Sequence, residues 1–408
     1  METPTPLTIC YWLCIFLVSY TYVGYPAILW VLTRWRARPV HRLALSQFPS
    51  AQTAVSVVLT AHNEEETIGR RLTELLDHFA TQRLSGEVIV VSDGSTDRTV
   101  EIASAFGNRG GAVPVRLIVF PSNVGKSVAL SAGCAAAESE ILVFADVRQS
   151  WAPDALVRLL ENFADPMIGA VSGELRVESG LGVMQAVGFY WRYEKWIRQK
   201  ESLLHSTVGL TGSICAVRRN LFRPIPAGTL LDDVYWPLNV VMQGYRVVFD
   251  NRACAYDRLP DRMGSEFRRK VRTLTGNFQL VTRLWEACLP WRNPIWFSLF
   301  SHKLARLAVP WAMIVAFGCA VALGGELYGV LLAIQVAGLG IAFCGLVPAI
   351  SARSRLVSIA GAFFVLNAAA WWAFWVWVTG RASRSWTKVS YKHVGGLVVP
   401  RLSSPATD

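Results

Sequence analysis

Charged residues are scarce in this chain of 408 residues, and four long stretches contain none. Only 17% of the residues are Asp, Glu, Lys or Arg, whereas 52% are hydrophobic. Charge is absent between Glu2 and Arg34, and again from 307 to 325, 327 to 352 and 356 to 380. Each stretch reaches the roughly 20 residues that a helix needs to cross a bilayer. The composition therefore excludes an ordinary soluble domain and predicts a membrane protein.

Other missing features narrow the class further. The eight cysteines form no CxxC pair and have no nearby histidine that would complete a zinc set, so we expect reduced thiols. Residues 1–33 lack a basic start and a small-residue cleavage site, which predicts a retained transmembrane helix instead of a signal peptide. The net charge of +11 comes from basic residues that flank apolar stretches. This distribution favours anionic lipid headgroups as partners and argues against nucleic acid.

The middle of the chain, residues 45–285, is long enough for one large domain. It contains a predicted amphipathic interfacial helix over 188–204, where aromatic and basic residues alternate; plain domain core is the alternative. Residues 286–380 should form a membrane region with about three transmembrane or interfacial segments, as their apolar runs predict, and 381–408 a basic tail.

Basic residues suggest the orientation in an inner or plasma membrane. Four arginines between 34 and 42 follow the first apolar stretch, which places the middle domain in the cytoplasm. Ser351 to Arg355 fits a cytoplasmic loop after two more spans, but Arg381 would then lie outside. We therefore expect one segment to be interfacial, and the tryptophans between 371 and 377 make the last segment the candidate.

Two apolar runs end in polar turns. Val55 to Leu59 is rich in β-branched residues and precedes Thr60-Ala61-His62-Asn63-Glu64, and Val88 to Val91 runs into Ser92-Asp93-Gly94. Apolar residues at helical spacing lie between them, which predicts a βαβ unit. Because ligands bind at the carboxyl ends of strands in open α/β sheets, Thr60, His62, Asn63, Glu64 and Asp93 could line one crevice. Solvated loops with helix caps are the alternative.

A third apolar run, 141 to 144, ends in Ala145-Asp146-Val147-Arg148. Before it, Asn123-Val124-Gly125-Lys126 opens a predicted helix that runs to 137. A lysine at a helix amino terminus meets phosphate with its own charge and with the helix dipole. The three strand ends together indicate a nucleotide site.

Two later strings add polar groups. Glycine in Thr211-Gly212-Ser213 permits close backbone approach, although a turn before a short strand explains it too. Asp232 and Asp233 open a predicted helix that runs through Val241. Ordinary capping by acidic residues is the alternative there.

The order of these strings resembles that of family 2 inverting glycosyltransferases, over about Val55 to Phe278. The similarity is to the cellulose, hyaluronan and poly-N-acetylglucosamine synthase group. It implies an α/β fold, a Rossmann-like GT-A nucleotide-diphospho-sugar transferase domain, in addition to the transmembrane helices. It also implies that the strand-end residues and Lys126 bind a nucleotide-sugar. Thr211, Gly212 and Ser213 would then line the acceptor and sugar pocket.

The resemblance also implies a divalent metal. At the end of the third strand the family has Asp-x-Asp, which binds Mg²⁺ or Mn²⁺ and thereby the donor diphosphate. Asp146 matches the first aspartate, but Arg148 stands in place of the second. Either Asp146 binds the metal together with diphosphate oxygens, or Arg148 itself neutralises the leaving group.

By the same resemblance Asp233 is the general base, since an acceptor hydroxyl needs a carboxylate to take its proton. Asp232 beside it is the second catalytic candidate or a helix cap. In the place of the family's Q-x-x-R-W motif, Arg272 matches the Arg and is expected to meet the diphosphate, while Thr273 replaces the Trp. A basic segment on the bilayer surface is the alternative for this cluster. The missing Trp leaves processive synthesis open.

The resemblance thus implies a membrane-bound inverting glycosyltransferase. It would transfer a sugar, expected to come from a uridine diphosphate donor, to a glycan or lipid-linked acceptor with a β-linked product. Polysaccharide export proteins are expected further partners. A non-catalytic scaffold of a polysaccharide synthesis complex is the alternative, because the second Asp and the Trp are lost. A transporter is disfavoured, since no apolar stretch carries a central charge.

Overall fold

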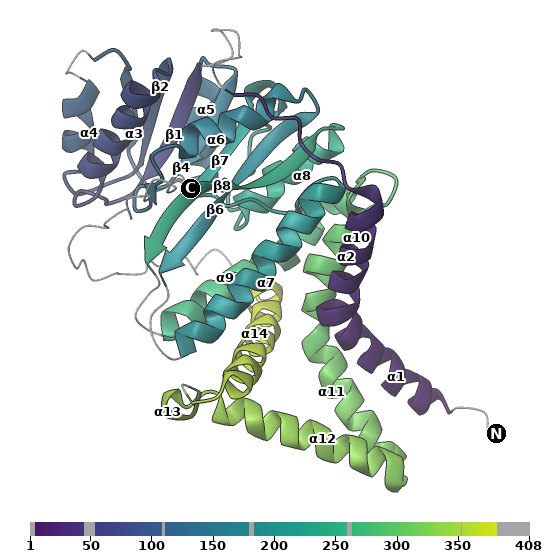
Figure 1. Cartoon of the computed structure of the whole chain (residues 1–408). Coiled ribbons are helices and arrows are strands. Elements are labelled where there is room, and N and C mark those ends of the chain that lie inside the picture. Colours follow the sequence, from purple (N-terminus) through teal and green to yellow (C-terminus); the bar gives the residue numbers. More distant parts are fainter. Residues whose placement is uncertain are drawn as a thin grey trace, which may run out of the picture.

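The computed structural model describes residues 5–44, 54–107, 111–178, 183–258, 263–351 and 353–381. An eight-stranded sheet lies at one end of the molecule, and long helices extend from it at the other (Figure 1). The strand order is β3-β2-β1-β4-β7-β6-β8-β5. The strands are β1 Val55–Ala61, β2 Gly86–Asp93, β3 Val115–Phe120, β4 Ile141–Ala145, β5 Ser150–Trp151, β6 Ile168–Glu178, β7 Ile214–Arg218 and β8 Arg246–Arg258.

The parallel half of the sheet is the one that the sequence predicted. β1 pairs in parallel with β2 and β4, and β2 with β3. The helix α3 (Ile68–Gln82) connects β1 to β2, which confirms the βαβ unit. The carboxyl ends of β1, β2 and β4 therefore meet at one edge of the sheet.

The antiparallel strand β7 brings a further segment to that edge. It pairs with β4, and Ala145 lies opposite Ile214 in the register. Because the two strands run in opposite directions, the residue after Ala145 and the residue before Ile214 are neighbours. Asp146 and Ser213, which are far apart in the sequence, thus come together.

Both faces of the sheet are covered. Val57 and Leu59 of β1 pack on one face with α3, α4 (Thr99–Gly107) and α6 (Ala155–Leu160). Val58 points to the other face, where α5 (Lys126–Ala136) and α8 (Asp232–Met242) lie. Such burial on both sides explains why β1 is a continuous apolar run instead of an alternating one.

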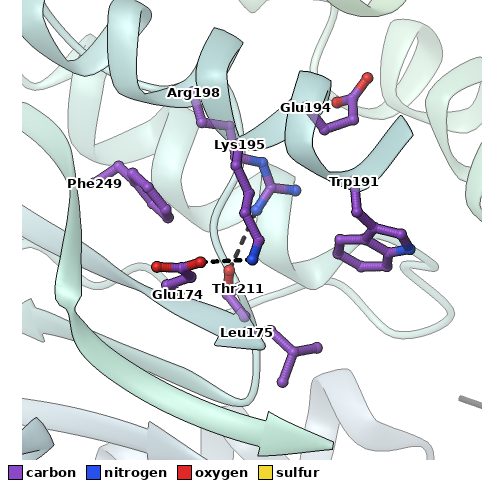
Figure 2. Close-up of a pocket in the computed structure, with 8 residues that line it drawn as sticks. All are labelled: Glu174, Leu175, Trp191, Glu194, Lys195, Arg198, Thr211 and Phe249. Carbon is purple, nitrogen blue, oxygen red and sulfur yellow. Dashed lines mark hydrogen bonds and ion pairs between the residues drawn. The ribbon is translucent and has the colours of Figure 1, made fainter. Parts of the chain in front are cut away.

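The predicted amphipathic helix is α7 (Val183–Leu204), which contacts the sheet on one side and α2 and α14 on the other. On the sheet side, Lys195 Nζ lies 2.5 Å from Glu174 Oε1 of β6. Arg198 Nη1 donates a hydrogen bond of 3.2 Å to Thr211 Oγ1 (Figure 2). α7 therefore connects the sheet to the membrane helices.

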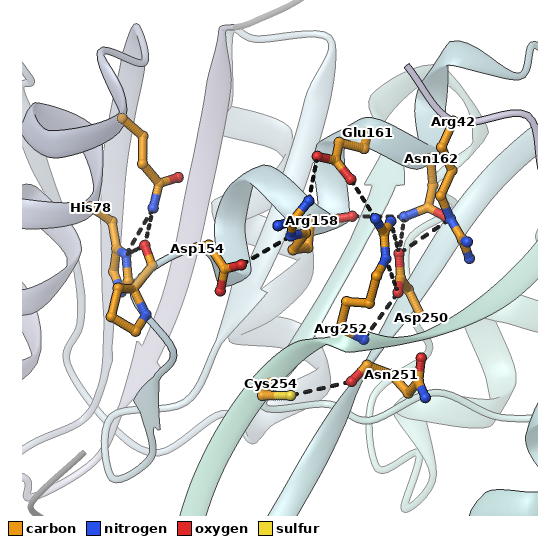
Figure 3. Close-up of polar contacts among 12 residues, drawn as sticks. Arg42, His78, Asp154, Arg158, Glu161, Asn162, Asp250, Asn251, Arg252 and Cys254 are labelled. Atoms are coloured by element: carbon orange, nitrogen blue, oxygen red, sulfur yellow. Dashed lines mark hydrogen bonds and ion pairs between the residues drawn. The ribbon is translucent and has the colours of Figure 1, made fainter. Parts of the chain in front are cut away.

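The segment that follows α2 (Tyr25–Arg36) is attached to the sheet by a polar cluster (Figure 3). Arg42 Nε donates to Asn162 Oδ1 at 2.9 Å and lies 3.4 Å from Asp250 Oδ2. Arg252 also pairs with Asp250, at 2.7 Å. Burial alone would raise the pKa of Asp250, but the hydrogen bonds from Arg252 and Asn162 outweigh it and lower that pKa. The cluster is fully paired, so we assign it a structural role.

Four helical segments in the described part of the chain are long and apolar enough to cross a membrane. They match the four charge-free stretches. The first joins α1 (Pro6–Ser19) to α2 through a π-helix, η1 (Tyr20–Gly24). The others are Trp296–Leu323, which contains α10 (Trp296–Leu299), the π-helix η7 (Phe300–Leu304) and α11 (Ala305–Leu323), then α12 (Gly325–Cys344) and α14 (Arg355–Val378).

The last helix returns toward the sheet. α11 runs away from the domain, α12 and the short α13 (Pro348–Ser351) lie at the far end, and α14 leads back (Figure 1). Trp311, near the start of α11, has its ring centroid 3.9 Å from that of Trp371 in α14. Trp377 stacks on Phe278 of α9 (Met263–Arg283) at 5.7 Å. The start of α11 and the end of α14 therefore lie on the same side.

A buried charged network joins α7 to the membrane helices. His302 of η7 is 1% exposed, and its Nδ1 and Nε2 lie 2.8 Å from Glu201 and 2.9 Å from Glu194. Arg306 pairs with Glu194, and Tyr25 Oη donates to Glu201 at 2.7 Å. Burial would raise the pKa of Glu194, but Arg306 and His302 hold it well below its usual value. The two π-helices meet at this place, where Tyr20 Oη lies 2.6 Å from Ser301 Oγ.

His302→Ala should strongly destabilise the protein. It removes the group between two buried carboxylates, and loss of one partner of a buried ion pair costs about 3–5 kcal/mol of unfolding free energy. We expect a clearly lower melting temperature for the variant in detergent micelles. His41→Ala, at an exposed histidine, is the matched control and should melt like the wild type. Equal melting of His302→Ala and wild type would contradict the role of the network.

Candidate active site

Asp93, at the end of β2, holds the loop that precedes α5. Its carboxylate accepts hydrogen bonds from the backbone N–H of Val124 at 2.6 Å and of Gly125 at 3.1 Å. Gly94 has φ +65°, and a Cβ there would lie 2.3 Å from the carbonyl carbon of Ser122. Only glycine allows this approach. The two strings that the sequence analysis singled out separately thus form one structure.

The other residues of the first turn also connect to this structure. His62 Nδ1 donates to the carbonyl oxygen of Asp93 at 2.6 Å. Asn63 has φ 53° and accepts a 2.8 Å hydrogen bond from the N–H of Thr96. Glu64 accepts a 2.9 Å hydrogen bond from the hydroxyl of Thr67. Thr60, half-buried, points to the α5 face at the end of β1. All four lie at the predicted edge, and these hydrogen bonds connect Asn63 and Glu64 to neighbouring turns.

The centre of the site is a lysine among carboxylates. Lys126 Nζ lies 3.2 Å from Asp146 Oδ1 and 4.0 Å from Asp232 Oδ2. The negative charges, Asp146 first and then Asp232 and Asp233, raise the pKa of Lys126 above its usual value and outweigh its burial. The ammonium group is therefore charged at the place where a phosphate would meet the amino terminus of α5.

Asp233 has the properties of a general base. Burial and the neighbouring Asp232 raise the pKa of Asp233 to about 6, although Lys126 and Arg198 oppose the shift. It lies in the first turn of α8, and a Cβ on Gly212 would lie 3.8 Å from its Cβ. A carboxylate with a pKa close to the working pH is well suited to proton transfer.

The helix α9 positions the loop that leads to the aspartate pair. Gln279 Oε1 accepts a 3.0 Å hydrogen bond from the N–H of Leu230. Gly276 packs so closely that a Cβ there would lie 2.5 Å from Leu231 Cγ. Leu231 directly precedes Asp232, so the position of the pair depends on α9. Arg272 lies on this helix and is half-buried.

Thr211, Gly212 and Ser213 lie between this cluster and α7. The N–H of Thr211 donates to Ser172 Oγ at 2.9 Å, and its hydroxyl accepts from Arg198. The carbonyl of Ser213 accepts a hydrogen bond from Trp151 Nε1 at 3.1 Å. The Ser213 hydroxyl is buried and has no hydrogen-bond partner among the described residues. A bound sugar could satisfy it.

The structure brings Lys126, Asp146, Asp232, Asp233 and Gly212 into one cluster. Arg148 is oriented elsewhere: its Nη2 lies 4.0 Å from Asp257 Oδ2 of β8.

Sequence reasoning missed Arg198 and Lys303 as members of the site. Both positive charges act on Asp233 and oppose the rise of its pKa that burial and Asp232 cause. Arg198 was visible only as one basic residue of an amphipathic helix, and Lys303 as part of a membrane segment. Their place follows from tertiary packing: that of α7 against the sheet for Arg198, and that of η7 beside α7 for Lys303.

The residues fit a divalent cation only with help from a donor. No group of three or more His, Cys, Asp or Glu that could hold a metal occurs in the described part of the chain. Mg²⁺ is commonly bound through one or two carboxylates together with substrate phosphates. Asp146 can provide such a carboxylate, and the phosphate oxygens of the donor would complete the coordination.

Comparison with known proteins defines the class. Residues 56–225 match the family model "Glycosyl transferase family 2". A solved mannosyltransferase from Pyrobaculum calidifontis, in complex with GDP-Man and Mn²⁺, shares the fold with a TM-score of 0.62 at 24% identity. The match covers 88% of this chain and 99% of that one. The mixed sheet is therefore a GT-A fold, as predicted.

Similar sequences agree with this class. The poly-β-1,6-N-acetyl-D-glucosamine synthase of Staphylococcus epidermidis is 24% identical over 288 residues, which cover 69% of this chain and 68% of that enzyme. The synthase of Staphylococcus aureus (strain COL) is 24% identical over 277 residues, covering 64% of this chain and 63% of the enzyme. The chain thus spans about two thirds of the length of these relatives. It is a glycosyltransferase with a family 2 domain, in a membrane protein.

The raised pKa of Asp233 predicts a pH-dependent rate. The base must be ionised to accept a proton, so kcat/KM should fall about tenfold per pH unit below about pH 6. Asp232→Asn removes a neighbouring negative charge and should move the midpoint to lower pH. A profile that stays flat down to about pH 5 would contradict this, because only an unshifted aspartate, pKa about 4, remains ionised there.

Proposed function

We propose that the protein transfers a sugar from a nucleotide-sugar, a uridine diphosphate sugar by our expectation, to a glycan acceptor with inversion, forming a β-linked polysaccharide. The observation that supports it best is Asp233, with its raised pKa, beside the Lys126–Asp146 pair. One group can accept a proton while the other meets a leaving diphosphate. The names of the similar synthases agree with a polysaccharide product.

The reaction divides between these two groups. The acceptor hydroxyl attacks the anomeric carbon of the donor sugar from the face opposite the nucleotide, and its proton passes to Asp233. The bond from that carbon to the diphosphate oxygen breaks, and the nucleoside diphosphate leaves with the electron pair. Lys126 at the start of α5 stabilises the charge that develops there.

A divalent cation, Mg²⁺ or Mn²⁺, would be held by Asp146 and would neutralise part of the diphosphate charge. Arg148 lies next to Asp257 of β8 and is not assigned a contact with the diphosphate. We propose that the nucleoside contacts Thr60, His62, Asn63 and Glu64. Asp93 would hold the neighbouring loop before α5 in place through its hydrogen bonds to Val124 and Gly125. Arg272 is proposed to approach the diphosphate from α9.

We also infer the orientation in the membrane. The start of α11 and the end of α14 lie on the same side, so an even number of crossings connects them. α12 then lies across the far side instead of spanning, and Arg381 faces the cytoplasm together with the sheet. Arg353 and Arg355 would face outward, the opposite of what charge alone suggested. The GT-A domain proper would comprise about residues 45–285.

Asp233→Asn should abolish transfer and retain nucleotide binding. Loss of a general base typically reduces the rate about 10²-fold to 10⁴-fold. The measurement is release of nucleoside diphosphate from a panel of nucleotide-sugars, in membranes supplied with Mg²⁺ or Mn²⁺, followed by sizing of the product. Asp77→Asn, at an exposed aspartate, is the control.

Full activity of Asp233→Asn would overturn the assignment of the base. A wild-type protein that binds no nucleotide and turns over no donor would instead favour a scaffold.

The orientation can be tested with reporter fusions. Alkaline phosphatase fused after Ser351 should be active, because this site lies outside in our topology, whereas the same enzyme at the C terminus should be inactive. Green fluorescent protein should show the reverse pattern. If α12 crossed the membrane instead, both results would be exchanged.

A further inference from the structure

The helix α3 is bonded to the turn that follows β4. Arg71 Nε donates a hydrogen bond of 3.1 Å to the carbonyl oxygen of Asp146. Arg70, the residue before it, donates from Nη2 to the carbonyl oxygen of Arg148 at 2.9 Å and from Nη1 to Ser150 Oγ at 2.6 Å. Two consecutive side chains of one helix thus bind the backbone of the turn that carries Asp146.

One helical turn further along α3, Glu74 binds the end of the same segment. Its Oε1 accepts a hydrogen bond of 2.5 Å from the backbone N–H of Trp151 and one of 2.8 Å from Arg71 Nη1. The indole N–H of Trp151 donates to the carbonyl oxygen of Ser213, which β7 brings next to the turn after β4. The helix is therefore connected to both of these neighbouring segments of the site. We call its three side chains the α3 clamp: Arg70, Arg71 and Glu74.

The complete burial of Arg71 is unusual for an arginine, and it is costly unless the charge is compensated. Glu74 supplies the opposite charge at 2.8 Å, and Arg71 Cζ lies 4.4 Å from the centroid of the Trp151 ring. Its Nη2 is buried without a hydrogen-bond partner among the described residues. An apolar side chain could fill the same place at lower cost. What it could not do is bind the backbone of the turn.

Hydrogen bonds to the backbone of the turn also restrict the direction of the Asp146 side chain. The peptide group is planar, so a held carbonyl oxygen leaves little freedom for the Cα–Cβ bond of its own residue. The Asp146 carboxylate points to Lys126, at 3.2 Å. Residues 147 to 151 contain no other carboxylate that could bind a cation together with it. The accuracy of this one carboxylate's position therefore matters more than it would in a pair.

We propose that the α3 clamp is a positioning unit for the Asp146 carboxylate, and that it sets the affinity for a divalent cation bound together with a nucleoside diphosphate. The inference rests on the proposed function. Groups that orient a metal ligand without touching the metal typically change metal affinity or activity about 10-fold to 100-fold when they are replaced. The clamp thus provides through the backbone part of the rigidity that a second carboxylate would provide by direct coordination.

The test is Arg71→Lys in the full-length protein in detergent micelles. Lysine keeps the positive charge, but its ammonium group cannot replace the planar guanidinium that reaches the Asp146 carbonyl and Glu74 together. The probe is uridine diphosphate, or the nucleoside diphosphate that the donor panel releases, and its binding is measured by calorimetry with Mn²⁺ and with EDTA. The dissociation constant in Mn²⁺ should rise about tenfold, and that in EDTA should change less than about twofold.

Hydrogen exchange, followed by mass spectrometry, tests the clamp without any ligand. The amides of residues 146–151 should exchange roughly tenfold faster in Arg71→Lys than in the wild type, because the turn opens more often once its carbonyl is released. The amides of β1 should be protected equally in both proteins.

Arg83→Lys, at an exposed arginine that follows the last residue of α3, is the matched control and should leave both measurements unchanged. If Arg71→Lys does not fold, Arg70→Ala tests the same unit, because the Arg70 side chain is 41% exposed and its removal releases only the Arg148 carbonyl and the Ser150 hydroxyl. It should show the same pattern, with weaker binding in Mn²⁺ and faster exchange in the turn.

Equal weakening of nucleotide binding in Mn²⁺ and in EDTA would overturn the inference, since it would indicate general damage to the site. Unchanged exchange of residues 146–151, or a wild type whose nucleotide affinity is the same in Mn²⁺ and in EDTA, would overturn it as well. A wild type that binds no nucleoside diphosphate and turns over no donor would instead contradict the proposed function, and hydrogen exchange would still decide whether the clamp holds the turn.

Discussion

The buried Glu201–His302–Glu194 network determines how the catalytic sheet meets the membrane helices. Its two carboxylates belong to α7, and its histidine to the π-helix η7 in the second of the four candidate membrane-spanning segments. Each ring nitrogen faces a carboxylate oxygen, so one imidazole ring joins both acids of α7. Breaking any one contact leaves a buried charge without compensation, which makes alternative packings of α7 costly. Because Arg198 lies between the two glutamates in sequence, the helix turns that are fixed by the network also place its guanidinium beside Thr211.

The sequence predicted the parts of the fold that depend on local pattern. Continuous β-branched runs specified β1, β2 and β4, and the polar residues after them were correctly expected at one edge. Asp232 and Asp233 at the head of a helix were also recognisable. In contrast, Ser213 beside Asp146 results from antiparallel pairing of distant segments, and no local signal contains that register. The place of Arg198 depends on the tertiary contacts of α7, which amphipathic spacing cannot specify.

Arg148, which stands in place of the second carboxylate of the metal motif, makes contact with β8. Arg148 pairs with Asp257, and Gln149 donates to the same carboxylate at 2.7 Å, so this turn is fixed to β8. The fully buried Arg71 holds the backbone of Asp146, because its Nε donates a 3.1 Å hydrogen bond to the carbonyl oxygen of that residue. Asp146 is therefore held at its place by backbone contacts. Its carboxylate points toward Lys126. The sequence predicted that Lys126 would meet a phosphate, but it did not predict the ion pair between Lys126 and Asp146.

The pairing of Lys126 with carboxylates has a consequence for the balance of charge. Asp146, Asp232 and Asp233 can carry three negative charges, and Lys126, Arg198 and Lys303 three positive ones. The site is close to neutral before a donor enters. A diphosphate therefore brings negative charge that these six side chains do not offset, and a counter-ion that arrives with it becomes the simplest way to restore neutrality. Donor affinity should thus depend on the ionic composition of the medium as much as on the shape of the sugar.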